Sequence, residues 1–88
     1  MRIQVRQTGG FAGLDRRAAV DTAGRPDANA WQALADQALA GGRAAPPAGV
    51  PDGFQYEITV DGRTVHCADP HLTEAQRELI ARVLKEGA

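Results

Sequence analysis

The sequence predicts an α+β fold: a four-stranded antiparallel sheet with two helices packed on one face. Two observations lead to this prediction. Two pairs of strand-like segments are each joined by a glycine-containing turn, and each pair is followed by a segment with helical periodicity. The expected element order is therefore ββαββα. The chain of 88 residues is long enough for one domain, residues 1–88, built around one modest core.

The first predicted hairpin surrounds the loop Gly9-Gly10-Phe11-Ala12-Gly13. Apolar and polar residues alternate before the loop, over 2–8, and after it, over 14–20, as is typical of strands. The glycines between them let the backbone take positive φ, so that the chain can reverse tightly. We expect the inward positions to be Ile3, Val5, Leu14, Ala18 and Val20, and the outward ones to include Arg2, Gln4, Arg6 and Arg17.

The first helix is expected to begin near Asp27 or Asn29, after a break at residues 23–26, and to end at about Ala40. Gly41-Gly42 provides the stop. The apolar positions of this helix follow the spacing of a one-sided stripe: Trp31, Leu34, Ala35, Ala38 and Leu39. Residues 43–53, which include three prolines, are expected to form an extended connection.

The second hairpin carries the clearest local signal in the chain. Apolar residues alternate with polar ones over 54–60, and Asp61-Gly62 is a favoured type I′ turn. This turn places Ile58 opposite Val65 and Tyr56 opposite Cys67, so both strands direct their apolar groups to the same side. The other face of the sheet is expected to be exposed; it carries Arg2, Arg6, Arg17, Gln55, Glu57, Thr59, Thr64 and His66.

The last predicted helix runs from about Glu74 to Glu86. Thr73 and Gln76 have the spacing of a capping box, and Glu74 lies favourably in the first turn. One face of the helix is apolar apart from Gln76; it comprises Leu72, Gln76, Leu79, Ile80, Val83 and Leu84.

Composition and charge exclude several classes of protein. The net charge of −1 gives no overall attraction to nucleic acid or to an anionic membrane, and no apolar run reaches membrane-spanning length. The N-terminal residues are too polar for a signal peptide, and the single cysteine, Cys67, suits a reducing compartment. We therefore expect a cytoplasmic protein.

The residues predict no catalytic site, no metal site and no cofactor. The chain has no serine, and Cys67 is expected to be a small buried hydrophobe. His66 and Cys67 are adjacent on a strand and point to opposite faces, so together with His71 they do not form a metal site. The glycine loop lacks the Lys-Ser/Thr ending of a phosphate-binding loop. These features favour a binding module over an enzyme.

Two questions of function stay open at the level of residue patterns. Phe11, at the tip of its loop, either folds back onto its own hairpin or presents itself to a partner. The arginines of the first hairpin (Arg2, Arg6, Arg16 and Arg17) are expected on a solvated sheet face; a nucleic-acid surface is the alternative, although no exposed aromatic residues alternate with them.

The opening segment, Met1 to Leu14, resembles the emfourin family of small bacterial protealysin inhibitors. That family combines a short strand, a Gly-Gly-Phe-Ala-Gly loop and a strand with basic residues, here Arg16-Arg17. It also has an aromatic-rich strand similar to residues 54–60 and a closing amphipathic helix similar to 74–85. The resemblance covers residues 1–21 and 53–86.

This resemblance implies a proteinaceous inhibitor of a thermolysin-like zinc metallopeptidase, encoded nearby and present in the same cell. The positions that match the family loop, and that are expected to bind the protease, are Gly9, Gly10, Phe11, Ala12, Gly13 and Leu14. Thermolysin-like enzymes prefer a bulky apolar side chain just after the cut bond, which Phe11 offers. We expect the free protein to be a monomer that binds neither membranes nor nucleic acid.

The expected mechanism is occlusion of the active-site cleft and not capture of the zinc ion. The loop contains no Cys or His, and Asp15 is the only carboxylate near it in the sequence. Two alternatives remain: a regulatory or nucleic-acid-binding module that uses the arginine-bearing hairpin, and a subunit that buries the loop in a stable complex.

Overall fold

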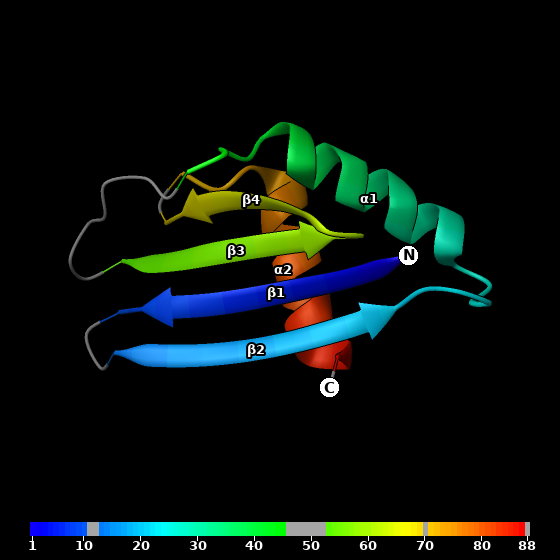
Figure 1. Ribbon diagram of the computed structural model, residues 1–88, viewed down its shortest axis with the longest axis horizontal. Coiled ribbons are helices and arrows are strands. Elements are labelled where there is room, and N and C mark those ends of the chain that lie inside the picture. The colour runs from blue at the N-terminus through cyan, green and yellow to red at the C-terminus, as the bar shows by residue number, and fades with distance from the viewer. Residues whose placement is uncertain (11–12, 46–52, 70, 88) are drawn as a thin grey trace.

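The computed structural model describes residues 1–10, 13–45, 53–69 and 71–87, with only the backbone of Leu14. It confirms the predicted order ββαββα (Figure 1). The strands and helices are β1 (Arg2–Gly9), β2 (Leu14–Asp21), α1 (Ala28–Ala40), β3 (Phe54–Val60), β4 (Arg63–Ala68) and α2 (Glu74–Glu86). Neither of these helices is long and apolar enough to cross a membrane.

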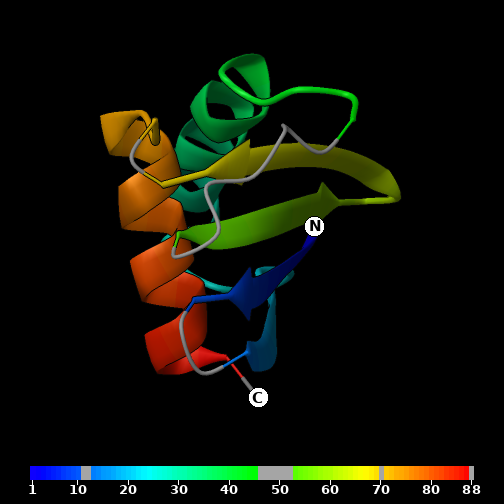
Figure 2. The same ribbon diagram turned by 90° about the vertical axis from the view of Figure 1, so that its left-hand side faces the viewer.

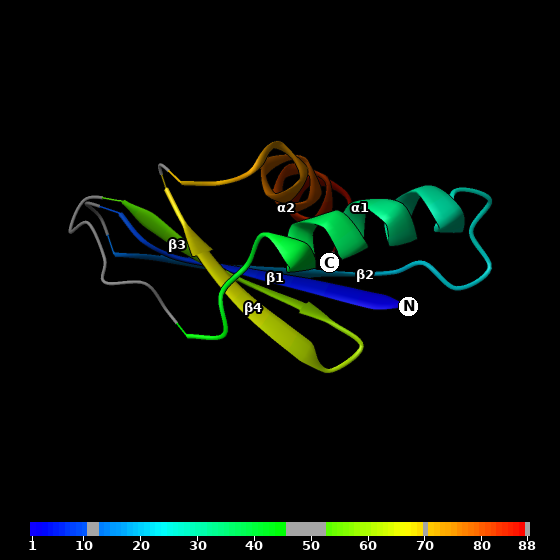
Figure 3. The same cartoon turned by 90° about the horizontal axis from the view of Figure 1, so that it is seen from above.

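The four strands form one antiparallel sheet in the order β2-β1-β3-β4. Both helices lie on the same side of this sheet, as predicted, and the opposite face is left uncovered by them (Figures 2 and 3). The β1–β3 pair is the long-range contact that joins the two ββα halves, and it runs from Ile3 opposite Val60 to Gly9 opposite Phe54. The end of β1 that enters the glycine loop therefore lies beside the start of β3.

The core lies between the sheet and the helices and contains the predicted inward residues. It comprises Ile3, Val5, Ala18, Val20, Trp31, Leu34, Ala35, Ala38, Leu39, Tyr56, Ile58, Val60, Val65, Cys67, Leu79, Ile80 and Val83. Leu14 is opposite Gly9, at an inward register position, but its side chain is outside the described part of the structure. Leu72 and Leu84 are only partly buried.

The second hairpin has the turn and the register that its sequence predicts. Asp61 and Gly62 have φ of 48° and 84°, and positive φ at both central residues is what a type I′ turn requires. Ile58 is opposite Val65 and Tyr56 is opposite Cys67. This hairpin is therefore fixed by local sequence.

The capping box of α2 is also present, and its Gln76 has a second role. The Thr73 hydroxyl accepts a hydrogen bond from the Gln76 N–H (3.1 Å), and the Gln76 Oε1 accepts one from the Thr73 N–H (3.0 Å). The Gln76 side chain is fully buried, and its Nε2 donates to the carbonyl of Ala38 in α1 (3.1 Å). All of its polar atoms are satisfied, which explains a polar residue on the apolar face of α2.

The start of α1 is capped differently from the start of α2. Asp27 is the N-cap residue, but its side chain caps no backbone N–H of the helix. Its carboxylate instead accepts hydrogen bonds from the Trp31 Nε1 (3.0 Å) and the Arg25 Nε (3.0 Å). The hydrogen bond from Arg25 lowers the pKa of Asp27, because it stabilises the ionised carboxyl. Asp27 therefore orients the indole of the largest core residue.

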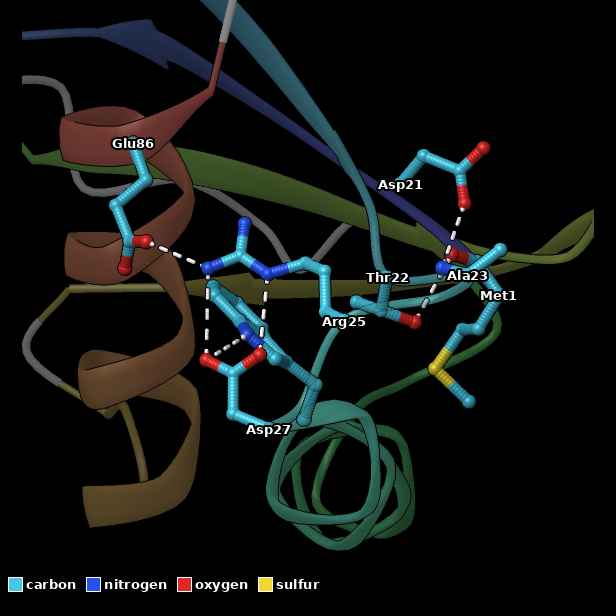
Figure 4. Close-up of polar contacts among 8 residues, drawn as sticks. Met1, Asp21, Thr22, Ala23, Arg25, Asp27 and Glu86 are labelled. Atoms are coloured by element: carbon cyan, nitrogen blue, oxygen red, sulfur yellow. Dashed lines mark hydrogen bonds and ion pairs between the residues drawn. The ribbon is translucent and has the colours of Figure 1, made fainter.

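Arg25 extends this cluster to the second helix. Its Nη2 also donates to Glu86 at the end of α2 (3.1 Å). Arg25 therefore links the start of α1 to the end of α2 (Figure 4). The guanidinium groups of Arg25 and Arg82 lie 5.5 and 5.9 Å from the centroid of the Trp31 ring. Next to this cluster, the Met1 carbonyl accepts hydrogen bonds from the N–H and the hydroxyl of Thr22 (2.9 and 3.2 Å), which ties the first strand to the chain that leaves β2.

Candidate functional site

The glycine loop lies at one end of the sheet, and its glycines adopt the backbone conformation that the sequence predicts. Gly9, Gly10 and Gly13 have φ of +93°, +75° and +66°, values that residues with a side chain rarely adopt. The Gly13 N–H donates to the Gly10 carbonyl (3.2 Å) and closes the reversal. Phe11 and Ala12 lie outside the described residues, so both alternatives for Phe11 stay predictions.

The start of β3 holds the base of this loop. The Gly10 N–H donates to the carbonyl of Gly53 (3.1 Å). A Cβ atom at Gly9 would lie 2.9 Å from that same carbonyl oxygen, and one at Gly10 would lie 2.6 Å from the Cε1 atom of the Phe54 ring. Glycine is therefore required at these two positions by close approach as well as by φ.

Sequence reasoning did not identify Gly53 and Phe54 as part of this site. Their only sequence signal is a glycine before an aromatic residue at the start of a strand, and that pattern says nothing about which strand lies beside it. The pairing of β1 with β3 brings them to the loop.

A polar network supports the same end of the sheet. The Gln7 Nε2 of β1 donates to the Tyr56 hydroxyl of β3 (3.2 Å), and that hydroxyl donates to the Asp69 carboxylate after β4 (3.4 Å). The Asp69 N–H in turn donates to the carbonyl of Phe54 (3.0 Å). Burial raises the pKa of Tyr56 above its ordinary value of 10.0, and its hydroxyl is a protonated donor at neutral pH in either case. The network connects the ends of three strands next to the loop.

The arginines of the first hairpin make contacts within the protein. Arg6 donates from its Nε and Nη2 to the Asp15 carboxylate (3.2 and 3.1 Å), and its Nη1 lies 3.8 Å from Glu57. Arg17 lies 3.9 Å from Asp15. Arg16 was expected on the solvated face, but it lies on the helix side of β2, because it alternates with Arg17 along the strand, and it donates to the carbonyl of Leu84 in α2 (3.1 Å). The acidic partners of Arg6 and Arg17 offset the positive charge of these two residues on the outer face, which argues against a nucleic-acid surface there.

The same contacts bear on zinc capture. The hydrogen bond from Arg6 lowers the pKa of Asp15, so this carboxylate stays ionised and is bound by a guanidinium. Among the residues that the structure describes, no three His, Cys, Asp or Glu side chains gather in a way that could hold a metal ion.

His66 and Cys67 point to opposite faces of β4, as predicted. Cys67 is buried on the core side, and burial raises the pKa of its thiol to about 11. His66 lies on the other face, 3.8 Å from Glu57, but its side chain is only 14% exposed, less than expected. Arg43 forms two backbone hydrogen bonds with His66 (2.9 and 2.7 Å), so the chain after α1 runs along the edge of β4.

The raised pKa of Cys67 gives a testable prediction. At neutral pH the folded protein should react with a thiol reagent such as DTNB only as fast as it unfolds, because the thiol is both buried and protonated. Between about pH 9 and 11 the unfolded thiol loses its proton while the folded one keeps it, so the free energy of unfolding should fall as pH rises. Urea denaturation at pH 8 and pH 10 measures this. Cys67→Ala should show a smaller fall, and an equal fall in both proteins would contradict the assignment.

The loop glycines give a second prediction, on stability. Gly13→Ala should lower the free energy of unfolding by about 1–2 kcal/mol, the cost of a left-handed backbone for a residue with a side chain. No steric cost is added, because a Cβ atom at Gly13 would meet nothing within 4 Å. Gly10→Ala should cost roughly 1–3 kcal/mol more, because its Cβ would also press on the Phe54 ring. Urea denaturation of the two variants compares them. Equal losses would show that Phe54 is not packed against Gly10.

These features define a candidate binding loop: a hairpin whose base is fixed by positive-φ glycines and by the hydrogen bond from Gly10 to Gly53. The Emfourin family model matches residues 5–84, and the chain belongs to this family. The resemblance of the opening segment is thereby confirmed. Membership of this inhibitor family indicates that the protein is a metallopeptidase inhibitor, in agreement with the expectation that it is not an enzyme. No curated protein and no solved structure shows a significant match to the chain.

Proposed function

We propose that this protein inhibits a thermolysin-like zinc metallopeptidase by filling its active-site cleft with the loop Gly9 to Leu14. Family membership supports the inhibitor role. The observation that supports this loop as the inhibitory segment is its fixed base. The glycines there have positive φ, and the Gly10 N–H donates a hydrogen bond to the Gly53 carbonyl. A loop whose base is already fixed loses less entropy when it binds.

The strand pairing would protect such a loop from cleavage by the protease whose cleft it fills. β1 and β2 are paired along their full lengths, from Arg2 opposite Asp21 to Gly9 opposite Leu14. If the protease cut the loop, the sheet would hold both new ends in place, so the products would not separate. Phe11 then acts as the anchor, in the pocket for the residue just after the cut bond.

In the proposed mechanism, no group of the inhibitor coordinates the zinc ion of the protease. The loop has neither Cys nor His, and the Asp15 carboxylate is engaged by Arg6. We propose further that the target protease is encoded nearby and meets the inhibitor in the cytoplasm, and that the inhibitor is a monomer when free.

The test is a titration of a purified thermolysin-like metallopeptidase with the full chain. We expect activity on a peptide substrate to fall to zero near one equivalent of inhibitor. A serine protease in parallel should be unaffected. Absence of inhibition at micromolar concentrations of the full chain would contradict the proposed function.

A further inference from the structure

We propose that Phe54 is a positioning residue for inhibition: its ring is the surface against which Gly10 rests, and this contact keeps the loop from being cut. This inference rests on the proposed function, because it concerns the loop that would enter the protease. It adds a residue from β3, far from the loop in sequence, to the determinants of inhibition.

Phe54 occupies an unusual position on its strand. Tyr56, Ile58 and Val60 share its inward face and are buried, whereas Phe54 is only partly buried, at the end where the core stops. The ring is nevertheless packed closely on Gly10, since a Cβ atom there would lie 2.6 Å from the Phe54 Cε1. The ring therefore packs both against the core and against the base of the loop.

The backbone around Phe54 is held from two sides. Gly53 accepts the hydrogen bond of the Gly10 N–H (3.1 Å), and the carbonyl of Phe54 accepts that of the Asp69 N–H (3.0 Å). The ring thus projects from a segment tied to both β1 and the end of β4. Because this segment is held in place, the ring of Phe54 is also held in place and can restrict the backbone of Gly10.

The consequence concerns the fate of the loop in the protease. Hydrolysis adds one water across a peptide bond and yields a new carboxylate and a new amine. To be cut, the loop must adopt the extended backbone of a substrate, and the glycine conformations and the Phe54 contact oppose that change. Without the ring, Gly10 loses the side chain that packs against it next to its hydrogen bond to Gly53. This hydrogen bond should therefore break more often.

The experiment compares three variants of the full chain: Phe54→Ala, Phe54→Leu and Val60→Ala. Leucine keeps an apolar side chain but ends at Cδ, so it lacks the Cε1 and Cζ atoms of the ring that lie closest to Gly10. Val60 is on the same face of β3 at its opposite end, six residues away or ~20 Å along the strand, so Val60→Ala is a matched control for lost stability. Three quantities are measured: the inhibition constant, the intact mass after incubation with the protease, and the hydrogen exchange of the Gly10 amide without protease.

Phe54→Ala should weaken inhibition about tenfold, the factor that ~1.4 kcal/mol of lost pre-organisation produces. It should yield two fragments with the new chain ends between Gly9 and Leu14. Their masses should sum to that of the intact chain plus one water, because a chain with one cysteine has no internal disulfide to join them. Its Gly10 amide should exchange about tenfold faster for the same reason. Phe54→Leu should retain part of each property, and Val60→Ala should remain uncut.

Two results would overturn the inference while leaving the proposed function intact. One is a Phe54→Ala protein that inhibits like wild type and stays uncut. The other is weaker inhibition without cleavage or faster Gly10 exchange, which would make Phe54 a direct contact. If wild type inhibits no metallopeptidase, the proposed function fails, and Gly10 exchange alone decides whether Phe54 orders the loop.

Discussion

Replacing Phe11 with alanine should weaken inhibition of a thermolysin-like protease by a factor of about 30 to 1,000, equivalent to ~2–4 kcal/mol of binding free energy. A single large apolar side chain in a loop whose base is fixed is the kind of residue that dominates an interface. The three glycines of the loop have no side chain, and Phe11 is the largest side chain that the loop can place in an apolar pocket. Inhibition constants of wild type and variant measure the effect.

Phe11→Leu is the matched control for this prediction. Leucine is also bulky and apolar, so it should retain most of the affinity if the pocket selects for apolar volume. Thermal unfolding of both variants separates a binding effect from a folding one. Should Phe11→Ala inhibit as well as wild type, the anchor claim is wrong, and the outer sheet face or another loop must make the contact.

The largest expected effect on stability is that of Trp31→Ala, which should lower the free energy of unfolding by about 3–5 kcal/mol. Trp31 is the largest fully buried side chain, and its removal would leave a cavity between the helices and the sheet. It would also remove the N–H that donates to Asp27 and the ring beneath the guanidinium of Arg25. Urea denaturation followed by circular dichroism gives the value.

Trp31→Phe separates the contribution of the apolar volume of Trp31 from that of its hydrogen bond to Asp27. Phenylalanine keeps most of the apolar volume but loses the N–H, so the loss should be smaller than for alanine and should include about 1 kcal/mol for the hydrogen bond to Asp27. A Trp31→Ala protein as stable as wild type would show that this residue does not fill the core.

The elements that were predicted correctly are those whose signals are local. Asp61-Gly62 fixes both the turn and the register of the second hairpin, since positive φ is required at both residues. Thr73 and Gln76 likewise mark the start of α2 through hydrogen bonds between residues three apart. Such signals need no knowledge of the rest of the fold.

The features that were missed depend on contacts between distant segments. The strand order β2-β1-β3-β4 follows from which strands pair across the chain, and no turn encodes it. Phe54 reads as an ordinary strand residue until β3 is placed beside β1. In the same way, Asp27 has the sequence of a helix cap, yet the buried indole of Trp31 competes for its carboxylate and binds it.

For the candidate site, the sequence predicted the glycine conformations because positive φ at the reversal leaves few other residues possible. The family was indicated by the five-residue loop and its flanking strands, and the match over residues 5–84 confirms it. The orientation of Phe11 has no comparable local determinant. The two alternatives for this residue are therefore decided by binding measurements.

The central claim is that the loop Gly9 to Leu14 occupies the active-site cleft of the protease. The most direct measurement is a competition between this protein and a small zinc-directed inhibitor that fills the pocket for the residue after the cut bond. The account predicts mutually exclusive binding: the apparent affinity of the protein should fall in proportion to the occupancy of the small inhibitor. Simultaneous binding of both, with unchanged affinities, would contradict cleft occlusion.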